Sequence, residues 1–189
     1  ARARVALERS AGLATVVFRG GAGVAEDGAG RRARRLLRAA LPDGVWPHKK
    51  KKAIKINNGY ANRYDNLCNI NTSIQNGNTI VSIFSAKKRK FPMSIKMMEK
   101  HPLGSQAFIP MRESTFLVFV APRGEKPDVK KIKSFIVPKQ TGVNYKPGIW
   151  HFPLISKKNM NFLVVDRKGK GNNLVIHNFK KEKLILKNG

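Results

Sequence analysis

Short apolar runs recur between residues 79 and 177, and Gly, Pro or Asn residues separate most runs from the next. Runs of this length, rich in Ile, Val and Phe and bounded by turn residues, predict β-strands rather than helices. The expected strands are 79–84, 105–110, 115–120, 134–137, 161–166 and 174–177. Many short strands without an internal repeat are typical of an all-β sandwich or barrel.

Two turn signals lie among these strands. Asn76-Gly77-Asn78 is a hairpin signal before the first expected strand. Pro147-Gly148 favours a tight turn, because Pro fixes φ and Gly accepts a positive φ, and a strand is expected to resume near His151. Residues 93–100 and 128–133 are compatible with short helical turns.

The composition changes abruptly near residue 48. Residues 1–47 contain no Lys and no Asn and are rich in Ala, Arg and Gly, whereas the chain after His48 is rich in Lys, Asn and Ile. We therefore interpret residues 1–47 as an extension that is disordered, loosely attached or an artefact of the gene model. Residues 48–189 are expected to form one folded domain, and the fold to survive deletion of the extension.

The charge changes this picture less than its size suggests. A formal net charge of +27 would ordinarily indicate a polyanionic partner. However, apart from the run Lys49 to Lys52, the lysines are scattered through every segment, and no zinc-finger spacing or RNA-recognition motif is present. Of the functional interpretations, nucleic-acid binding is therefore the one that the sequence favours least.

Two further features bound the location. Cys68 is the single cysteine, so an intramolecular disulfide framework and a cysteine-based zinc site are excluded, and a reducing, cytoplasmic location fits best. No apolar run approaches the ~20 residues that a membrane-spanning helix requires. The sequence predicts a cytoplasmic protein without a membrane partner.

The candidate chemistry lies in two runs some forty residues apart. Glu99 and His101 are two residues apart, so on a strand their side chains share a face. Gln106 follows five residues later, and His151 comes just after the Pro-Gly turn. A carboxylate, a carboxamide and two imidazoles are therefore expected to converge inside one curved sheet.

These four positions resemble the paired motifs of the cupin barrels, in which the first motif supplies three ligands and the second a fourth after a Pro-Gly turn. The resemblance implies an all-β, cupin-like double-stranded β-barrel. No cofactor is certain on this basis. A divalent ion such as Ni, Mn or Zn would be held by Glu99, His101, Gln106 and His151, and weakly, because a Gln stands in place of a carboxylate.

Longer stretches are similar to the ureidoglycolate lyases of allantoin breakdown. They are 99–110, 142–145, 150–151 and 162–167, together with 56–59 and the pair Arg63-Tyr64. Membership of this family implies a carbon–nitrogen lyase that releases urea and glyoxylate from ureidoglycolate in purine nitrogen catabolism. It also implies a homodimer, and it favours a strand rather than a helical turn for at least the end of residues 93–100.

The resemblance assigns roles to individual residues. Glu99, His101 and His151 are the expected catalytic groups, since imidazole and carboxylate can move protons near neutral pH. Gln106, Lys146 and Arg63 are the expected substrate-binding groups, and Arg167 is a further cation that could hold the substrate carboxylate.

The chain also departs from the family pattern. Lys146 and Phe152 stand where family members usually have histidine, and an arginine expected near the end of the strand at 82–85 is missing, so Lys87 or Arg63 would have to replace it. These departures keep a second interpretation open, in which the chain is a non-catalytic cupin that binds a small metabolite.

Overall fold

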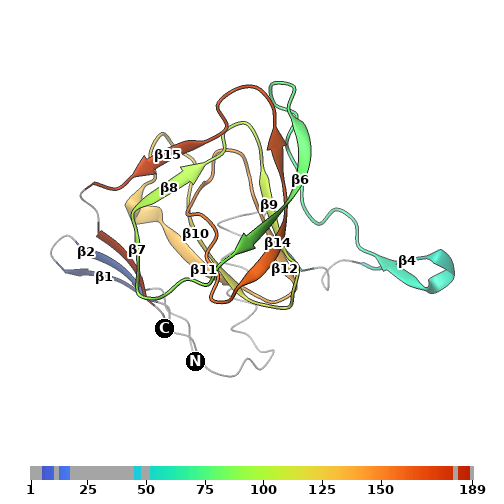
Figure 1. Cartoon of the computed structure of the whole chain (residues 1–189), viewed down its shortest axis with the longest axis horizontal. Helices are drawn as coiled ribbons and strands as arrows, with labels where there is room; N and C mark the ends of the chain where they lie inside the picture. The colour runs from blue at the N-terminus through green and yellow to red at the C-terminus, as the bar shows by residue number, and fades with distance from the viewer. Residues whose placement is uncertain (1–5, 11–12, 18–44, 48–51, 181–182, 188–189) are drawn as a thin grey trace.

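The computed structural model describes residues 6–10, 13–17, 45–47, 52–180 and 183–187 of the chain (Figure 1). Its regular structure is almost entirely β, as the sequence predicts. The strands are β1 (Ala6–Ser10), β2 (Leu13–Val17), β3 (Val45–Pro47), β4 (Ile54–Ile56), β5 (Ala61–Arg63), β6 (Asn78–Ala86), β7 (Met93–Ile95), β8 (Met97–Lys100), β9 (Gln106–Pro110), β10 (Phe116–Ala121), β11 (Lys133–Val137), β12 (Thr141–Tyr145), β13 (Trp150–His151), β14 (Met160–Lys168), β15 (Val175–Asn178) and β16 (Lys183–Lys187).

Two five-stranded sheets form the body. One has the strand order β11-β10-β13-β8-β15, and the other has the order β3-β12-β9-β14-β6. Every strand pair within these two sheets is antiparallel. Figure 1 shows β8 and β15 on one side of the barrel and β6, β9 and β14 on the other. The chain therefore has a cupin-like all-β fold.

The barrel interior is an apolar core between the two sheets. Its buried members come from β9, β10, β11, β12 and β14, and include Phe108, Phe116, Val118, Val143, Phe162 and Val164. Burial of this much aromatic and branched surface is the main term that stabilises such a body. A few polar side chains on the same inward faces then become available for chemistry.

A second core lies on the other face of β10. Leu117, Phe119 and Ala121 pack there against Trp150 and Ile95, together with residues of β16. Strand β10 is consequently buried on both faces along its whole length. An apolar run without alternation is the expected signature of such a strand.

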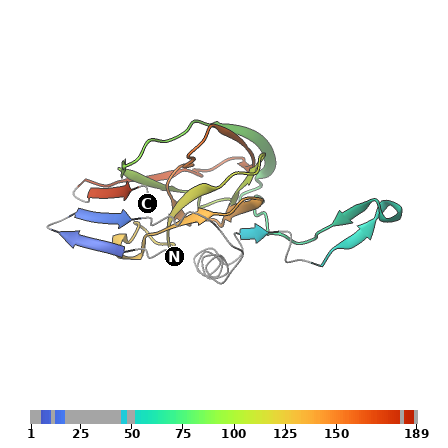
Figure 2. The same ribbon diagram turned by 90° about the horizontal axis from the view of Figure 1, so that it is seen from below.

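Two smaller sheets flank the body. Strands β1, β2, β16 and β7 form a four-stranded sheet in which β2 runs parallel to β16. Strands β4 and β5 form a two-stranded hairpin around a short 3-10 turn at Asn57–Gly59. Figures 1 and 2 show this hairpin extending away from the barrel.

All six strands expected from the apolar runs are confirmed, as β6, β9, β10, β11, β14 and β15. Residues 93–100 form β7 and β8 rather than helical turns, whereas Val129–Lys131 does form a short 3-10 turn. Residues Asn76 and Gly77 lie in a turn closed by the Gly77 amide donating to the Ile74 carbonyl, but the turn leads into β6 from an irregular segment rather than from a strand. It is therefore not a hairpin.

The extension at residues 1–47 contributes three described strands. β1 and β2 pair with each other, and β2 also pairs with β16, while β3 pairs with β12 of the body. The domain boundary at residue 48 stays a prediction, although β3 lies just before it. Within the part of the chain that the structure describes, no helix has the length and apolar content of a membrane span.

Candidate active site

Two rows of polar side chains, one from each sheet, meet inside the barrel. In the first row, His151 on β13 is the register partner of Glu99 on β8, and His101 follows one residue after the end of β8. In the second row, Tyr145 on β12 is the register partner of Gln106 on β9. The Tyr145 ring stacks on the His151 ring, with centroids 4.1 Å apart and planes 11° from parallel. This stacking joins the two rows.

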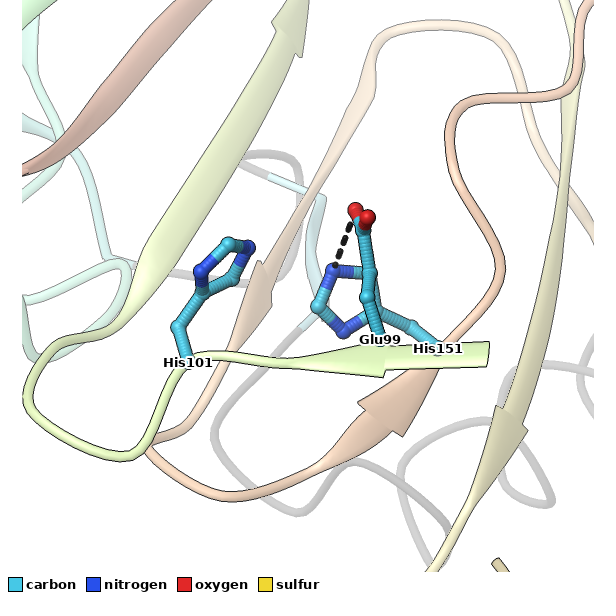
Figure 3. Close-up of side chains that lie close together, drawn as sticks. All are labelled: Glu99, His101 and His151. Carbon is cyan, nitrogen blue, oxygen red and sulfur yellow. Dashed lines mark ion pairs between the residues drawn. The ribbon is translucent and has the colours of Figure 1, made fainter. Parts of the chain in front are cut away.

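His151 and Glu99 form the closest charged pair of the site. The His151 Nε2 atom lies 3.5 Å from the Glu99 Oε1 atom, as the dashed line in Figure 3 shows. On the other side of the ring, the Nδ1 atom of His151 lies 3.0 Å from the carbonyl oxygen of Ile149. An Nδ1–H that donates to this carbonyl fixes the ring orientation and leaves Nε2 to exchange a proton with the carboxylate or a ligand.

His101 is held in the same manner. Its Nδ1 atom lies 2.7 Å from the carbonyl oxygen of Asn173, and its ring centroid lies 5.2 Å from that of His151 (Figure 3). The Nε2 atom of His101 is buried without a hydrogen-bond partner, and the buried Nε2 atom of His151 has only its 3.5 Å contact with Glu99. Buried polar atoms normally have a close partner, so these two imidazole nitrogens side by side indicate a place where a ligand or ion binds.

The Pro147-Gly148 turn couples the two motifs. The Ile149 amide donates to the Lys146 carbonyl, and Gly148 has a φ of 78°, as a type II turn requires at its third residue. The Gly148 amide also donates to the carbonyl of His101, and the Arg123 side chain donates to the carbonyl of Pro147. The turn predicted from the sequence is confirmed, and it fixes the spacing between His101 and His151.

The surroundings of Glu99 favour its charged form, whereas those of His101 favour its neutral form. Burial would raise the pKa of Glu99, but the hydrogen bond with His151 and the positive potential of both histidines outweigh it and lower that pKa below its ordinary value. Burial, together with the nearby His151, lowers the pKa of His101. Near neutral pH, Glu99 is therefore a carboxylate and His101 is predominantly a neutral imidazole.

A cavity of about 510 Å³ opens beside these rows. Glu99 and Gln106 lie in its wall together with the apolar side chains of Phe84, Phe108 and Leu154. The segment Lys87-Lys88-Arg89, which follows β6, contributes three cations to the same wall. This cavity combines an apolar lining with converging polar groups, as small-molecule sites do.

The structure places the other predicted binding residues differently. Arg63 lies on the β4–β5 hairpin, exposed and 3.0 Å from Asp65, so this chain does not bring its own Arg63 to the cavity. Lys146 follows directly after the inward-facing Tyr145 and is half-buried, and the described wall of the cavity does not include it. Lys87, the alternative to the missing arginine, does lie in that wall.

Arg167 serves the scaffold. Its guanidinium group donates to the backbone carbonyls of Ile74, Gln75 and Lys170, and the side chain is buried. A Cβ atom on Gly77 would clash with the Nε atom of Arg167, so the glycine leaves room for this side chain. Arg167 therefore holds the turn before β6 rather than a ligand.

Phe152, which stands in place of a family histidine, does not block the cavity. Its ring packs in the outer core with Leu117, Phe119 and Trp150. The second departure from the family pattern thus falls outside the site.

The site residues also fit a divalent ion. One ligand atom each from Glu99, His101 and His151 lie within 4.8 Å of one another. Imidazole and carboxylate donors suit Ni, Mn or Zn, and both histidine Nε2 atoms lack another partner. Gln106, the fourth expected ligand, lies in the adjoining cavity wall.

Sequence reasoning missed two residues of the site. The sequence alone assigns no chemical role to Tyr145, whose ring covers one face of His151. Asp166 on β14 lies beside Gln106, whose Nε2 atom is 3.5 Å from the Asp166 Oδ2 atom. The alternation of Phe162, Val164 and Asp166 along one apolar strand is the signal that could have identified Asp166 as inward-facing.

Comparison with known proteins gives a consistent result. A family model described as ureidoglycolate lyase matches residues 39–186. A ureidoglycolate lyase of Pseudomonas paraeruginosa is 46% identical over 132 residues, covering 69% of this chain and 78% of the relative. A ureidoglycolate lyase of Pseudomonas fluorescens is 45% identical over 133 residues, covering 69% of this chain and 80% of the relative.

Among solved structures, a TDP-fucose-3,4-ketoisomerase of Campylobacter jejuni matches with a TM-score of 0.37 and 15% sequence identity over 69% of this chain and 86% of that chain. A similarity at this level supports no argument about function. The family match is different, because it spans residues 39–186 and so includes both runs that carry the polar rows of the site. The chain belongs to the ureidoglycolate lyase family.

Proposed function

We propose that the chain is a carbon–nitrogen lyase that converts ureidoglycolate into urea and glyoxylate. The observation that carries this proposal is the convergence of Glu99, His101 and His151 beside a cavity, with the buried Nε2 atom of His101 unpartnered and that of His151 facing Glu99. The family membership supplies the substrate class, and the two histidines supply the two proton carriers that the reaction requires.

The substrate is a hemiaminal, in which one carbon carries a hydroxyl group, a carboxylate and a urea nitrogen. A base takes the hydroxyl proton, the C–O bond becomes a carbonyl, and the C–N bond breaks with its electron pair going to nitrogen. An acid then protonates that nitrogen. Atoms balance without water, since the two protons exchanged complete glyoxylate and urea.

The two histidines suit these two roles. His101 donates from Nδ1 to Asn173, and its lowered pKa favours a free Nε2 lone pair, so His101 is the proposed base. The Nε2 atom of His151 lies 3.5 Å from the Glu99 carboxylate, so a proton can pass between the two groups. The His151–Glu99 pair is therefore the proposed source of the proton for the leaving nitrogen.

Cations at the cavity mouth suit the substrate carboxylate. Lys87, Lys88 and Arg89 lie in the wall and are exposed. The backbone of Arg89 is anchored by its amide donating to the Ser156 carbonyl, and the Lys88 amide donates to the Asn159 side chain. Lys87 is the proposed carboxylate partner, in place of the arginine that this chain lacks and of Arg63.

A divalent ion is an additional proposal for the same residues. Glu99, His101 and His151 would hold it, and Gln106 would face it from the cavity wall. Such an ion would supply positive charge that stabilises a developing alkoxide. Dialysis against a chelator followed by addition of Ni²⁺, Mn²⁺ or Zn²⁺ tests this proposal, since restored activity with one of them would support it.

We also propose that the protein is a homodimer. Val81 and Ile83 on β6 are 63% and 60% exposed, and their register partners on β14 are Val165 and Leu163. These four side chains form an apolar stripe across the edge strand β6 and its neighbour β14, a surface that a second copy would cover. Sedimentation at micromolar concentration in 0.15–0.5 M salt should give a dimer, and Ile83→Lys should give a monomer.

A cytoplasmic location without a nucleic-acid partner is proposed on the sequence evidence alone. The single cysteine, Cys68, is a free and half-buried thiol. Fluorescence anisotropy with a labelled duplex at 0.15 M salt should show no saturable binding. Saturable binding under these conditions would revive the nucleic-acid interpretation.

Glyoxylate release from ureidoglycolate by the purified chain is the direct test of function. The expected result is turnover that is lost in Glu99→Gln and His151→Ala. Tight binding of ureidoglycolate without turnover would instead support the non-catalytic cupin, which the structure and the family membership do not favour.

A further inference from the structure

Gln106 and Asp166 occupy adjacent inward positions on neighbouring strands. Strand β9 pairs with β14 in a register that joins Ala107 to Val165, and one further step of the same register joins Gln106 to Asp166. Both residues share a face with buried apolar side chains of their own strands, Phe108 on β9 and Val164 on β14. The two side chains are therefore brought together by the sheet itself.

Their contact fixes the orientation of the carboxamide. The Gln106 Nε2 atom lies 3.5 Å from the Asp166 Oδ2 atom, and a carboxylate can accept a hydrogen bond only from the NH₂ end of an amide. The carbonyl end of Gln106 then points away from β14. Because Gln106 is 92% buried in the barrel and lies in the wall of the cavity, this end is the one it presents to a ligand.

The surroundings of the Asp166 side chain connect it to the site. Its Oδ1 atom is buried without a hydrogen-bond partner. Burial raises the pKa of Asp166, while the hydrogen bond from Gln106 and the neighbouring His101 oppose this effect. Asp166 as a whole is half-buried, but a carboxylate oxygen that is buried without a partner is unfavourable, so its presence calls for a role that an apolar residue could not fill.

We propose that Asp166 is a positioning residue that holds Gln106 with its carbonyl oxygen toward the cavity, so that the site selects ligands carrying a terminal ureido NH₂ group. Without the carboxylate, the Gln106 amide could rotate by 180° and present NH₂, which would oppose the same ligand group. This inference rests on the proposed function, because the urea end of ureidoglycolate is the group that would be recognised.

Two probes separate recognition of the urea end from recognition of the carboxylate. Oxalurate keeps the ureido group and carboxylate of ureidoglycolate but has a carbonyl in place of the CHOH carbon, so it cannot lose urea by the same elimination. Oxamate keeps the carboxylate and lacks the terminal carbamoyl group. Calorimetric titration of both probes into the full chain therefore measures the contribution of the terminal carbamoyl group, which carries the ureido NH₂.

The single variants give the first expectation. Gln106→Ala and Asp166→Ala should each weaken oxalurate binding about tenfold, as expected for loss or misorientation of one buried hydrogen bond. Both should change oxamate binding by less than about twofold. The matched control is Asp128→Asn. This variant removes a carboxylate that accepts a hydrogen bond from the Lys130 amide in another segment of the chain, and no change is expected for either probe.

A swapped pair distinguishes positioning from a merely structural role. Gln106→Glu alone sets two carboxylates against each other and should weaken oxalurate binding about tenfold or more. Gln106→Glu combined with Asp166→Asn restores an amide donor opposite a carboxylate acceptor, leaves the net charge unchanged and again presents an oxygen to the cavity. The double variant should bind oxalurate within about threefold of the wild type.

Either of two results would overturn the proposal. The first is equal weakening of oxalurate and oxamate by Asp166→Ala, and the second is a double variant no better than Gln106→Glu. If Asp166→Ala does not unfold cooperatively, the comparison of Gln106→Glu with the double variant tests the proposal by itself. A wild-type chain that binds oxalurate without releasing glyoxylate from ureidoglycolate would overturn the proposed function, while the swap would still judge the role of Asp166.

Discussion

Nε2 of His151 faces the carboxylate of Glu99 across two register-paired positions of neighbouring strands, at a distance of 3.5 Å. Backbone pairing sets this contact, because β13 and β8 meet only at these two residues. His151 is further held by the Ile149 carbonyl and by the Tyr145 ring. The pair is therefore rigid, as a proton-transfer group in a preorganised site should be.

Removal of either partner should affect turnover rather than substrate binding. We expect His151→Ala and Glu99→Gln each to lower kcat about 100-fold or more, with little change in KM, because proton transfer acts in the transition state. Steady-state kinetics of glyoxylate release would measure both constants. Lys87→Ala should mainly raise KM, since a carboxylate contact is already made in the ground state, and unchanged kcat in both first variants would refute the assignment.

The burial of His101 predicts a pH dependence of stability. Its pKa in the folded chain is lower than the ordinary value of 6.5, so the unfolded chain binds more protons over the window between the two values. The free energy of unfolding should therefore be highest above pH 6.5 and fall as the pH is lowered, by at most about 1.4 kcal/mol per pH unit for one such group.

Guanidinium chloride titrations between pH 7.5 and 5.5, with a chelator present, would measure this slope. His101→Gln should flatten it, because this variant removes the imidazole whose pKa burial lowers. Glu99 contributes outside this window, since its lowered pKa produces a loss of stability only below about pH 4.5. A slope that survives in His101→Gln would contradict the argument.

Arg167 offers a test that separates scaffold from substrate contact. Arg167→Lys cannot donate to the three carbonyls in the same geometry, and we expect it to lower the free energy of unfolding by about 2 kcal/mol. The KM of the folded variant should stay within about twofold of the wild type. Arg112→Lys is the control, because Arg112 is exposed and donates to one carbonyl. A large rise in KM without loss of stability would show that Arg167 binds substrate.

Two truncations test the role of the extension. Deletion of residues 1–38 keeps the whole segment that matches the family, and we expect a chain that unfolds cooperatively. Deletion of residues 1–47 also removes β3 from the edge of β12. We expect this chain to unfold cooperatively, with a free energy of unfolding that is lower by about 1 kcal/mol. Chemical denaturation measures both. Loss of cooperative unfolding after deletion of residues 1–38 would show that the body needs β1 and β2.

The strands of the barrel and the central residues of the site could be predicted from the sequence, because both depend on local patterns. Spacing by two placed Glu99 and His101 on one face, and Pro147-Gly148 fixed the turn before His151. Strands β12 and β16 were missed. Thr141–Tyr145 begins with Thr-Gly and contains an Asn, so its local pattern favours a strand only weakly. Pairing with β9 and β3 nevertheless makes this segment the strand β12.

Roles that depend on long-range contacts could not be predicted. The environment of Arg167 is created by carbonyls some ninety residues earlier, and that of Asp166 by a side chain sixty residues away. Arg63 matches a family motif, but the hairpin that carries it extends away from the barrel. A motif identifies a residue as part of the family pattern, whereas only the fold determines which cavity that residue reaches.

The most direct test of the central claim is to measure the nitrogen products of ureidoglycolate turnover. Elimination through Glu99, His101 and His151 consumes no water, so the account predicts one urea for each glyoxylate and no ammonia. Release of ammonia in place of urea would show hydrolysis of the ureido group instead and contradict the proposed lyase mechanism.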